Sequence, residues 1–333
     1  MAKIAAAFGS SHSIMLVSER DDWMHRYDTR DPTLPYFDLK TGEPTTYAAV
    51  LERAPAHGMD LVTPERMAAR YDATEAAMDR LRDEIANAKL DVLVIIGDDQ
   101  EELFRFTNMP AIAVYYGETI RNGAKTYPPP EDWQTRARWR RLEDKEDAQH
   151  PCHPGLALHL IEGLNERGFD IAAMKGLEPG QMAGHAISFI HYRYFRGRKT
   201  VPVVPILVNT YYPPNAPTPR RCVQLGEAVA ELIQSFPGDL RVGILASGGL
   251  SHFIVDEPLD KEVLDAIEAN DIAHLAALDP RRLKAGSSEI RCWIAVAAAV
   301  AKATKLKVSW QEYIPVYRTK AMTGIGLGFL RWS

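Results

Sequence analysis

Short apolar runs that end at glycine or polar residues dominate the hydrophobic pattern of the chain. Such runs predict strands that are buried on both faces. They lie at residues 3–8, 90–96, 111–116, 201–208 and 241–246. Between them, segments with capping signals or helical spacing of apolar residues predict helices. These segments are residues 63–88, 154–167, 221–236, 259–275 and 288–304.

The alternation of strands with helices predicts an α/β fold with a largely parallel central sheet flanked by helices. No repeat, low-complexity segment or break in composition divides the 333 residues, so we expect a single domain over residues 1–333. Residues 21–62 begin with a stretch rich in charge, proline and aromatic residues, and we expect them to be a loop insertion. Ligands of such sheets bind beyond the carboxyl ends of the strands, and we expect the functional site there.

Charge and cysteine content narrow the choice of partners and compartment. The net charge is −5, and the basic residues 136–141 are followed at once by acidic ones, which is typical of a solvated surface segment. We therefore expect no nucleic-acid partner. The apolar stretch 293–301 is far shorter than the roughly 20 residues that span a bilayer, so we expect no membrane partner. Three separated cysteines and an N-terminus unlike a signal peptide predict a cytoplasmic protein.

Titratable residues follow several predicted strands directly. His12 comes after the first strand, Asp98 and Asp99 after the second, and His252 after the last. Each has a simple structural explanation by itself, such as helix capping for an aspartate, or the helix dipole for Glu289 at a predicted helix start. Together, histidines and carboxylates at one rim are the ligands expected for a divalent metal. Non-haem Fe(II) oxygenases typically use two histidines and one carboxylate.

Seven segments, spread over nearly the whole chain, form a recognisable set. They are Ser11-His12-Ser13, Gly97-Asp98-Asp99, Gly184-His185-Ala186, residues 203–209, residues 220–228, Ser247-Gly248-Gly249-Leu250-Ser251-His252 and Ser288-Glu289-Ile290. With them the chain resembles the class III extradiol ring-cleaving dioxygenases, the superfamily of the protocatechuate 4,5-dioxygenase β subunit and of 2,3-dihydroxyphenylpropionate dioxygenase. Motifs of other enzyme classes, including Gly-x-Gly-x-x-Gly, the P-loop, His-Glu-x-x-His and Gly-x-Ser-x-Gly, are absent from the sequence.

The resemblance implies a non-haem enzyme that uses Fe(II), or Mn(II) as the alternative metal, with O2 as co-substrate. By position, His12 and Glu289 would bind the metal, His252 would act as the base, and His185 would act as the acid. The implied reaction is extradiol ring cleavage of a catechol-type aromatic acid of the protocatechuate, gallate or 3-O-methylgallate class. The resemblance also implies a small phenolic substrate and a homo-oligomer, for example a dimer. Some family members need a small second subunit, and no fused equivalent is evident in the sequence.

One segment departs from the family pattern. The second iron-binding histidine of the family follows an aspartate, in an Asn-Asp-His or Pro-Asp-His sequence after the strand. We place Asp99 there as the third metal ligand, with His57 as another side chain that could take this role. Gln100 and Ser251 are expected to orient a ligand or the substrate. Arg193 is expected to bind a substrate carboxylate, because its planar fork matches that group.

The changed ligand leaves other interpretations open. The first is an enzyme of the same fold with non-oxidative chemistry, a lyase, hydrolase or decarboxylase acting on a related aromatic or ring-opened acid. The second is a non-catalytic binding relative. The presence of both proton-transfer histidines argues against the second, because a mere binder has little need of them.

Overall fold

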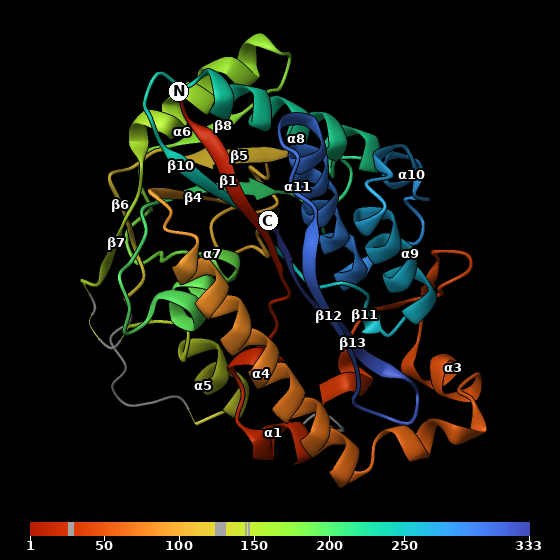
Figure 1. Ribbon diagram of the computed structural model, residues 1–333. Helices are drawn as coiled ribbons and strands as arrows, with labels where there is room; N and C mark the ends of the chain where they lie inside the picture. Colours follow the sequence, from red (N-terminus) through yellow and green to blue (C-terminus); the bar gives the residue numbers. More distant parts are fainter. Residues whose placement is uncertain (26–29, 124–130, 144, 146) are drawn as a thin grey trace.

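A nine-stranded sheet forms the centre of the protein (Figure 1). The computed structural model describes residues 1–25, 30–123, 131–143, 145 and 147–333. Along the sheet the strand order is β11-β13-β1-β10-β4-β9-β5-β8, and β12 pairs with β13. The strands are β1 Lys3–Ser10, β4 Val92–Asp98, β5 Ile112–Tyr115, β8 Ala172–Met174, β9 Val203–Val208, β10 Arg241–Ser247, β11 His252–Ile254, β12 Val308–Tyr317 and β13 Thr323–Trp332. The four central strands β1, β10, β4 and β9 are parallel, which confirms the predicted fold class.

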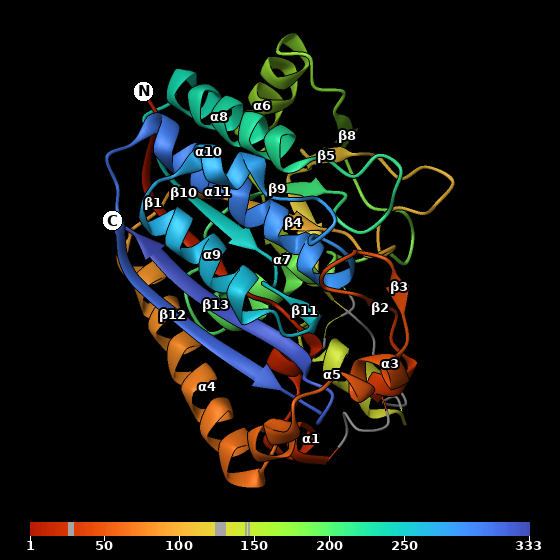
Figure 2. The same ribbon diagram turned by 90° about the vertical axis from the view of Figure 1, so that its right-hand side faces the viewer.

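Helices cover both faces of the sheet, as Figure 2 shows, with α8 and α11 on one side and α4 on the other. The main helices are α4 Pro64–Asn87, α6 Pro154–Glu166, α7 His185–Ile190, α8 Pro219–Ser235, α9 Glu257–Glu268, α10 Ile272–Ala277 and α11 Ile290–Ala303. Alternate residues of β4 enter two separate cores. Val94 and Ile96 pack with α8 and α11, whereas Leu93 and Ile95 pack with α4 and α7. A strand buried on both faces is therefore continuously apolar, which is the pattern seen in the sequence.

Shorter elements complete the chain. The short helices and turns are η1 Ile14–Val17, α1 Arg20–His25, η2 Asp31–Thr33, α3 Tyr47–Glu52, η3 Ala56–Leu61, α5 Trp133–Trp139, the π-helix η4 His191–Phe195 and η5 Ala285–Glu289. Two small ribbons pair β2 Tyr36–Phe37 with β3 Pro44–Thr45, and β6 Thr119–Arg121 with β7 Gln149–Pro151. The described part of the expected loop insertion thus holds short helices and one ribbon. In the part of the chain that the structure describes, no helix is long and apolar enough to cross a membrane.

Close packing of α8 on α11 fixes the start of α11 relative to the sheet. A Cβ added at Gly226 of α8 would lie 1.9 Å from the carbonyl oxygen of Ala295 in α11, so only glycine allows this approach. The predicted helix 259–275 proves to be two helices, α9 and α10. Asn270 adopts a positive φ of 57° between them, a conformation that ends a helix and that asparagine tolerates.

Candidate metal centre

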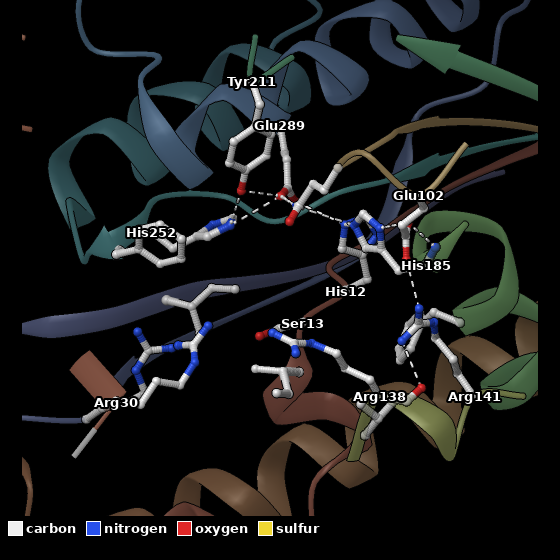
Figure 3. Close-up of a pocket in the computed structure, with 17 residues that line it drawn as sticks. His12, Ser13, Arg30, Glu102, Arg138, Arg141, His185, Tyr211, His252 and Glu289 are labelled. Atoms are coloured by element: carbon white, nitrogen blue, oxygen red, sulfur yellow. Dashed lines mark hydrogen bonds and ion pairs between the residues drawn. The ribbon is translucent and has the colours of Figure 1, made fainter. Parts of the chain in front are cut away.

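Four titratable side chains converge at the carboxyl ends of the central strands. His12 follows β1, Asp98 ends β4, and β10 lies between these two strands. His185 is the first residue of α7, and Glu289 lies at the N-terminus of α11. One ligand atom from each of the four lies within 4.8 Å of the others. The cluster borders a cavity of about 320 Å³, whose lining is drawn in Figure 3.

The spacing of these four atoms suits a single divalent ion. His12 Nε2 lies 3.0 Å from His185 Nε2, 3.2 Å from Glu289 Oε2 and 3.3 Å from Asp98 Oδ1. His185 Nε2 lies 3.6 Å from the same Asp98 oxygen. Ligand atoms bound to one ion at about 2.1 Å lie roughly 3.0–3.4 Å from their neighbours in octahedral or tetrahedral geometry.

Hydrogen bonds on the far side of each imidazole show which nitrogen carries the proton. Ser247 Oγ donates to the Ala186 carbonyl oxygen at 2.7 Å, so its contact with His12 Nδ1 at 3.0 Å requires Nδ1–H to donate. His185 Nδ1–H donates to Glu102 Oε2 at 2.6 Å. When the two rings are neutral, as metal binding requires, the Nε2 lone pair of each therefore faces the cluster.

The buried oxygen of Asp98 completes this convergence of lone pairs. Asp98 Oδ1 is fully buried and accepts no hydrogen bond, yet it faces both Nε2 atoms. Such a group is costly to bury without a positively charged partner. A divalent cation would satisfy the two imidazoles and both carboxylates together, so the residues present fit a metal ion.

The electrostatic field of the site favours a cation as well. Burial by itself lowers the pKa of His12, but Glu289 and Asp98 outweigh it and raise that pKa to about 10. For Glu289, burial raises the pKa, whereas His252 and His12 outweigh burial and hold the pKa well below its usual value. A metal ion would exploit the same negative potential.

Asp98, and not Asp99, lies in the cluster. Strand β4 continues through Asp98, and consecutive residues at a strand end point to opposite sides. The Asp99 carboxylate instead accepts hydrogen bonds from the backbone N–H groups of Leu103, at 2.9 Å, and Phe104, at 3.2 Å. Burial raises the pKa of Asp99 to about 6, although these two hydrogen bonds by themselves lower that pKa. Asp99, which we expected from the sequence to be the third metal ligand, is therefore not among the four converging side chains. The side chain of His57 lies outside the described part of the chain.

Matched residue by residue to the Asn-Asp-His pattern that the resemblance supplies, the segment puts Gln100, and not Asp99, opposite the histidine. The histidine is the third residue of Asn-Asp-His, and Gln100 is the third residue of Asp98-Asp99-Gln100. Its Nε2 lies 3.1 Å from Glu289 Oε1, 3.3 Å from Asp98 Oδ2 and 3.4 Å from His185 Nε2. The side chain lines the cavity and can orient the carboxylates of the cluster.

His252 and Tyr211 flank the other side of Glu289. His252 Nδ1 contacts the Leu250 carbonyl oxygen at 2.9 Å, so Nδ1 carries a proton and Nε2 faces the cavity. This Nε2 lies 3.3 Å from both Glu289 Oε1 and Tyr211 Oη. Tyr211 donates to Glu289 Oε1 at 2.8 Å. The sequence did not single out Tyr211, although it lies in the proline-rich loop that follows the carboxyl end of β9.

Glu102 and Arg141 hold His185 in place and were also not predicted. Glu102 Oε2 accepts from the backbone N–H of His185 at 2.7 Å as well as from its ring, and Arg141 Nη2 donates to Glu102 Oε1 at 2.8 Å. Arg141 Nε also donates to Ser188 Oγ in α7 at 2.8 Å. Burial raises the pKa of Glu102, but His185 and Arg141 outweigh it and lower that pKa to about 2.

Two predicted site residues lie elsewhere. Ser251 donates to Asp260 Oδ2 at 2.7 Å and does not line the cavity. Arg193 pairs with Asp79 at 2.8 Å and with Glu75 at 3.2 Å, so its guanidinium is directed to α4 and away from the cavity. The arginines that do line the cavity are Arg30, Arg138, Arg141 and Arg318.

Comparison with known proteins places these residues in a family context. Residues 55–328 match the family model described as the catalytic LigB subunit of aromatic ring-opening dioxygenase. A gallate dioxygenase of Pseudomonas putida is 46% identical over 57 residues, which cover 17% of this chain and 16% of that protein.

Two other relatives are named 2,3-dihydroxyphenylpropionate/2,3-dihydroxicinnamic acid 1,2-dioxygenase. The one from Comamonas testosteroni is 34% identical over 97 residues, covering 29% of each chain. The one from Photorhabdus laumondii is 26% identical over 217 residues, covering 48% of this chain and 65% of that protein. The matched segments thus span less than two thirds of each relative's length.

Proposed function

The chain belongs to the family of the catalytic LigB subunit of aromatic ring-opening dioxygenase, and from this premise we propose that it cleaves an aromatic ring with O2. The proposed reaction is extradiol cleavage of a catechol-type aromatic acid, of the protocatechuate, gallate or 3-O-methylgallate class. The proposed cofactor is Fe(II), with Mn(II) as the alternative. The convergence of His12, Asp98, His185 and Glu289 on a cavity large enough for one aromatic ring carries this proposal.

In this proposal His12, Asp98 and Glu289 hold the metal ion. A bound Fe(II) would supply the Lewis acidity that favours a catecholate and the electrons that activate O2. Glu289 is fixed for its role by Tyr211, by Gln100 and by the backbone N–H of Gly249, which donates to Glu289 Oε2 at 2.5 Å. A ligand held by this many partners keeps its orientation when substrate enters.

His252 is the proposed base. Its Nδ1–H is engaged by the Leu250 carbonyl oxygen, so Nε2 is the atom that meets a substrate in the cavity, and in the neutral ring it presents a lone pair there. A histidine in this state can accept the proton of a substrate hydroxyl near neutral pH. A Cβ at Gly286 would lie 1.8 Å from the His252 ring, so this glycine makes room for the imidazole.

The opposite wall of the cavity supports an acidic substrate. Figure 3 shows Arg30 and Arg138 across the cavity from Glu289 and Tyr211. Arg141 is paired with Glu102, and the single carboxylate of Asp31 lies between Arg30 and Arg318. Arg138 also lines this wall, and the planar fork of its guanidinium suits a substrate carboxylate. The proposal also retains the small phenolic substrate and the homo-oligomer expected from the sequence.

Oxygen uptake tests the proposal. Protein freed of metal and reloaded anaerobically with Fe(II) or Mn(II) is mixed with protocatechuate, gallate, 3-O-methylgallate and plain catechol, and O2 consumption is followed together with product absorbance. We expect uptake with at least one of the acids and none from the metal-free protein. Absence of uptake with every substrate and both metals would contradict the proposal. Turnover of an acid under strict anaerobiosis would favour the non-oxidative alternative instead.

A further inference from the structure

We propose that His185 supplies the second imidazole ligand of the metal in this chain, in which Gln100 and not a histidine follows Asp98-Asp99. This inference rests on the metal of the proposed function. It changes the role expected for His185 from a proton-transferring acid to a ligand. The ligand set then becomes His12, His185, Glu289 and Asp98, which restores two histidines to the site.

The hydrogen bonds of His185 leave its Nε2 suited to binding a metal. Glu102 Oε2 accepts from both the backbone N–H and Nδ1–H of His185, at 2.7 and 2.6 Å. These two bonds fix the ring orientation and the tautomer, so that the lone pair of Nε2 points at His12 Nε2 and Asp98 Oδ1. Metal-binding histidines commonly have such a carboxylate on their other nitrogen.

A neutral acid at this position does not fit the same contacts. To donate from Nε2, a neutral His185 would need its proton there. The bare Nδ1 would then lie 2.6 Å from the Glu102 carboxylate, with two lone pairs facing each other. No comparable carboxylate lies behind His252, whose Nδ1 contacts only a backbone carbonyl oxygen among the hydrogen bonds of the described residues. The two histidines are therefore prepared for different tasks.

Gln100 acts on Glu289 and not as the missing imidazole. Its Nε2 donates to Glu289 Oε1 at 3.1 Å, so the NH2 group, which has no lone pair for a metal, faces the cluster. Arg141 in turn fixes Glu102 at 2.8 Å. Glu102, Arg141 and Gln100 are thus positioning residues around a site in which α7 supplies the imidazole that the β4 loop has lost.

Metal affinity and ligand counting test the inference without relying on turnover. Metal-free full-length protein is titrated with Mn(II) by calorimetry, and pulsed electron paramagnetic resonance of the Mn(II)-loaded protein, with 15N-labelled histidine, counts the directly bound imidazole nitrogens. We expect two in the wild type and one in His185→Ala, with affinity lowered at least about 100-fold in that variant. The matched variant His252→Ala should keep two nitrogens and nearly wild-type affinity. Circular dichroism checks that both variants fold.

A rescue variant separates a ligand from a merely structural residue. In the double variant His185→Ala with Gln100→His, the second imidazole should return and the affinity should rise above that of His185→Ala. Glu102→Gln should weaken Mn(II) binding about 10- to 100-fold while still showing two imidazoles. If the wild type binds metal through one imidazole, or if His185→Ala binds as tightly as His252→Ala, the inference is overturned while the proposed function stands. A wild type that binds neither Fe(II) nor Mn(II) would overturn the proposed function itself.

Discussion

The Nε2 atoms of His12 and His185 lie 3.0 Å apart, although each ring already donates its Nδ1 proton on the opposite side. With both rings neutral, two lone pairs at this distance repel unless a metal ion lies between them; without a metal, the raised pKa of His12 lets a proton occupy this position instead. The nearby carboxylate oxygens of Asp98 and Glu289 further favour a cation at this position. Ser247 and Glu102, which contact the Nδ1 atoms of His12 and His185, thereby decide which nitrogen of each ring faces the cluster.

Substituting Asp98 and Asp99 one at a time distinguishes their roles. Asp98→Asn should weaken Mn(II) binding at least about 10-fold, since it removes a charged oxygen from the cluster. Asp99→Asn should leave metal binding nearly unchanged and lower the free energy of unfolding by about 1 kcal/mol, because an amide oxygen replaces a carboxylate that accepts two backbone N–H groups. Calorimetric titration and urea unfolding measure the two effects. A loss of metal by Asp99→Asn alone would restore Asp99 as the ligand.

Tyr211 should contribute to turnover more than to substrate binding. Tyr211→Phe removes the hydroxyl that donates to Glu289 and contacts His252. We expect kcat to fall about 10-fold with little change in KM, because the variant loses a hydrogen bond to the charged carboxylate of Glu289. Tyr212→Phe is the matched control, because the Tyr212 ring packs on Phe106 and does not line the cavity. Equal kinetics for the two variants would remove Tyr211 from the catalytic machinery.

Arg138 should select for a carboxylate on the substrate. Arg138→Gln should raise KM for protocatechuate or gallate about 10-fold, because the variant loses a charge-assisted hydrogen bond to the substrate carboxylate. KM for plain catechol, which has no carboxylate, should stay nearly unchanged. Steady-state oxygen uptake with the two kinds of substrate measures this difference. Arg193→Gln should change neither value, since Arg193 is bound to Glu75 and Asp79 away from the cavity. A similar rise in KM for catechol would mean that Arg138 acts on the shape of the cavity and not on the carboxylate.

Acid should destabilise the metal-free protein through His191. This side chain is buried and stacks on His150 with ring centroids 3.8 Å apart, and burial, with a smaller effect of His150, holds the pKa of His191 well below its usual value. The unfolded chain takes up a proton below about pH 6.5 and the folded protein does not, so this contribution lowers stability as pH falls.

A variant isolates this effect from other titrating groups. Below pH 6.5 the wild type should lose up to about 1.4 kcal/mol of unfolding free energy per pH unit relative to His191→Phe, because the variant has no imidazole at this position to protonate on unfolding. Urea unfolding in the presence of a chelator, at pH 5.0 to 7.5, measures this difference. A difference that does not depend on pH would show that His191 titrates alike in both states.

The sequence predicted the parts of the fold that depend on burial. The central strands are buried on both faces, so their apolar runs are continuous and easily recognised. Strand β13 was missed because it is rich in glycine, which weakens a strand pattern. A Cβ at Gly324 would lie 1.9 Å from the Val316 carbonyl oxygen of β12, so the pairing of β13 with β12 requires this glycine. The same glycine weakens the strand pattern in the sequence.

The candidate site was predictable only where residues follow strands or belong to a motif. His12 and Glu289 could be singled out in this way, whereas Glu102, Arg141 and Tyr211 come from loops that only the folded chain brings together. The choice between adjacent aspartates depended on the exact end of β4, because each added strand residue reverses the direction of the next side chain. Sequence patterns leave such ends uncertain by a few residues.

The most direct test of the account follows the oxygen atoms themselves. Fe(II)-loaded protein is incubated under 18O-labelled O2 with whichever aromatic acid supports uptake, and the ring-opened product is analysed by mass spectrometry. We expect both labelled atoms in the product before any exchange with water. A product without label, formed equally well under argon, would contradict ring cleavage by O2 and leave non-oxidative chemistry at the same four residues.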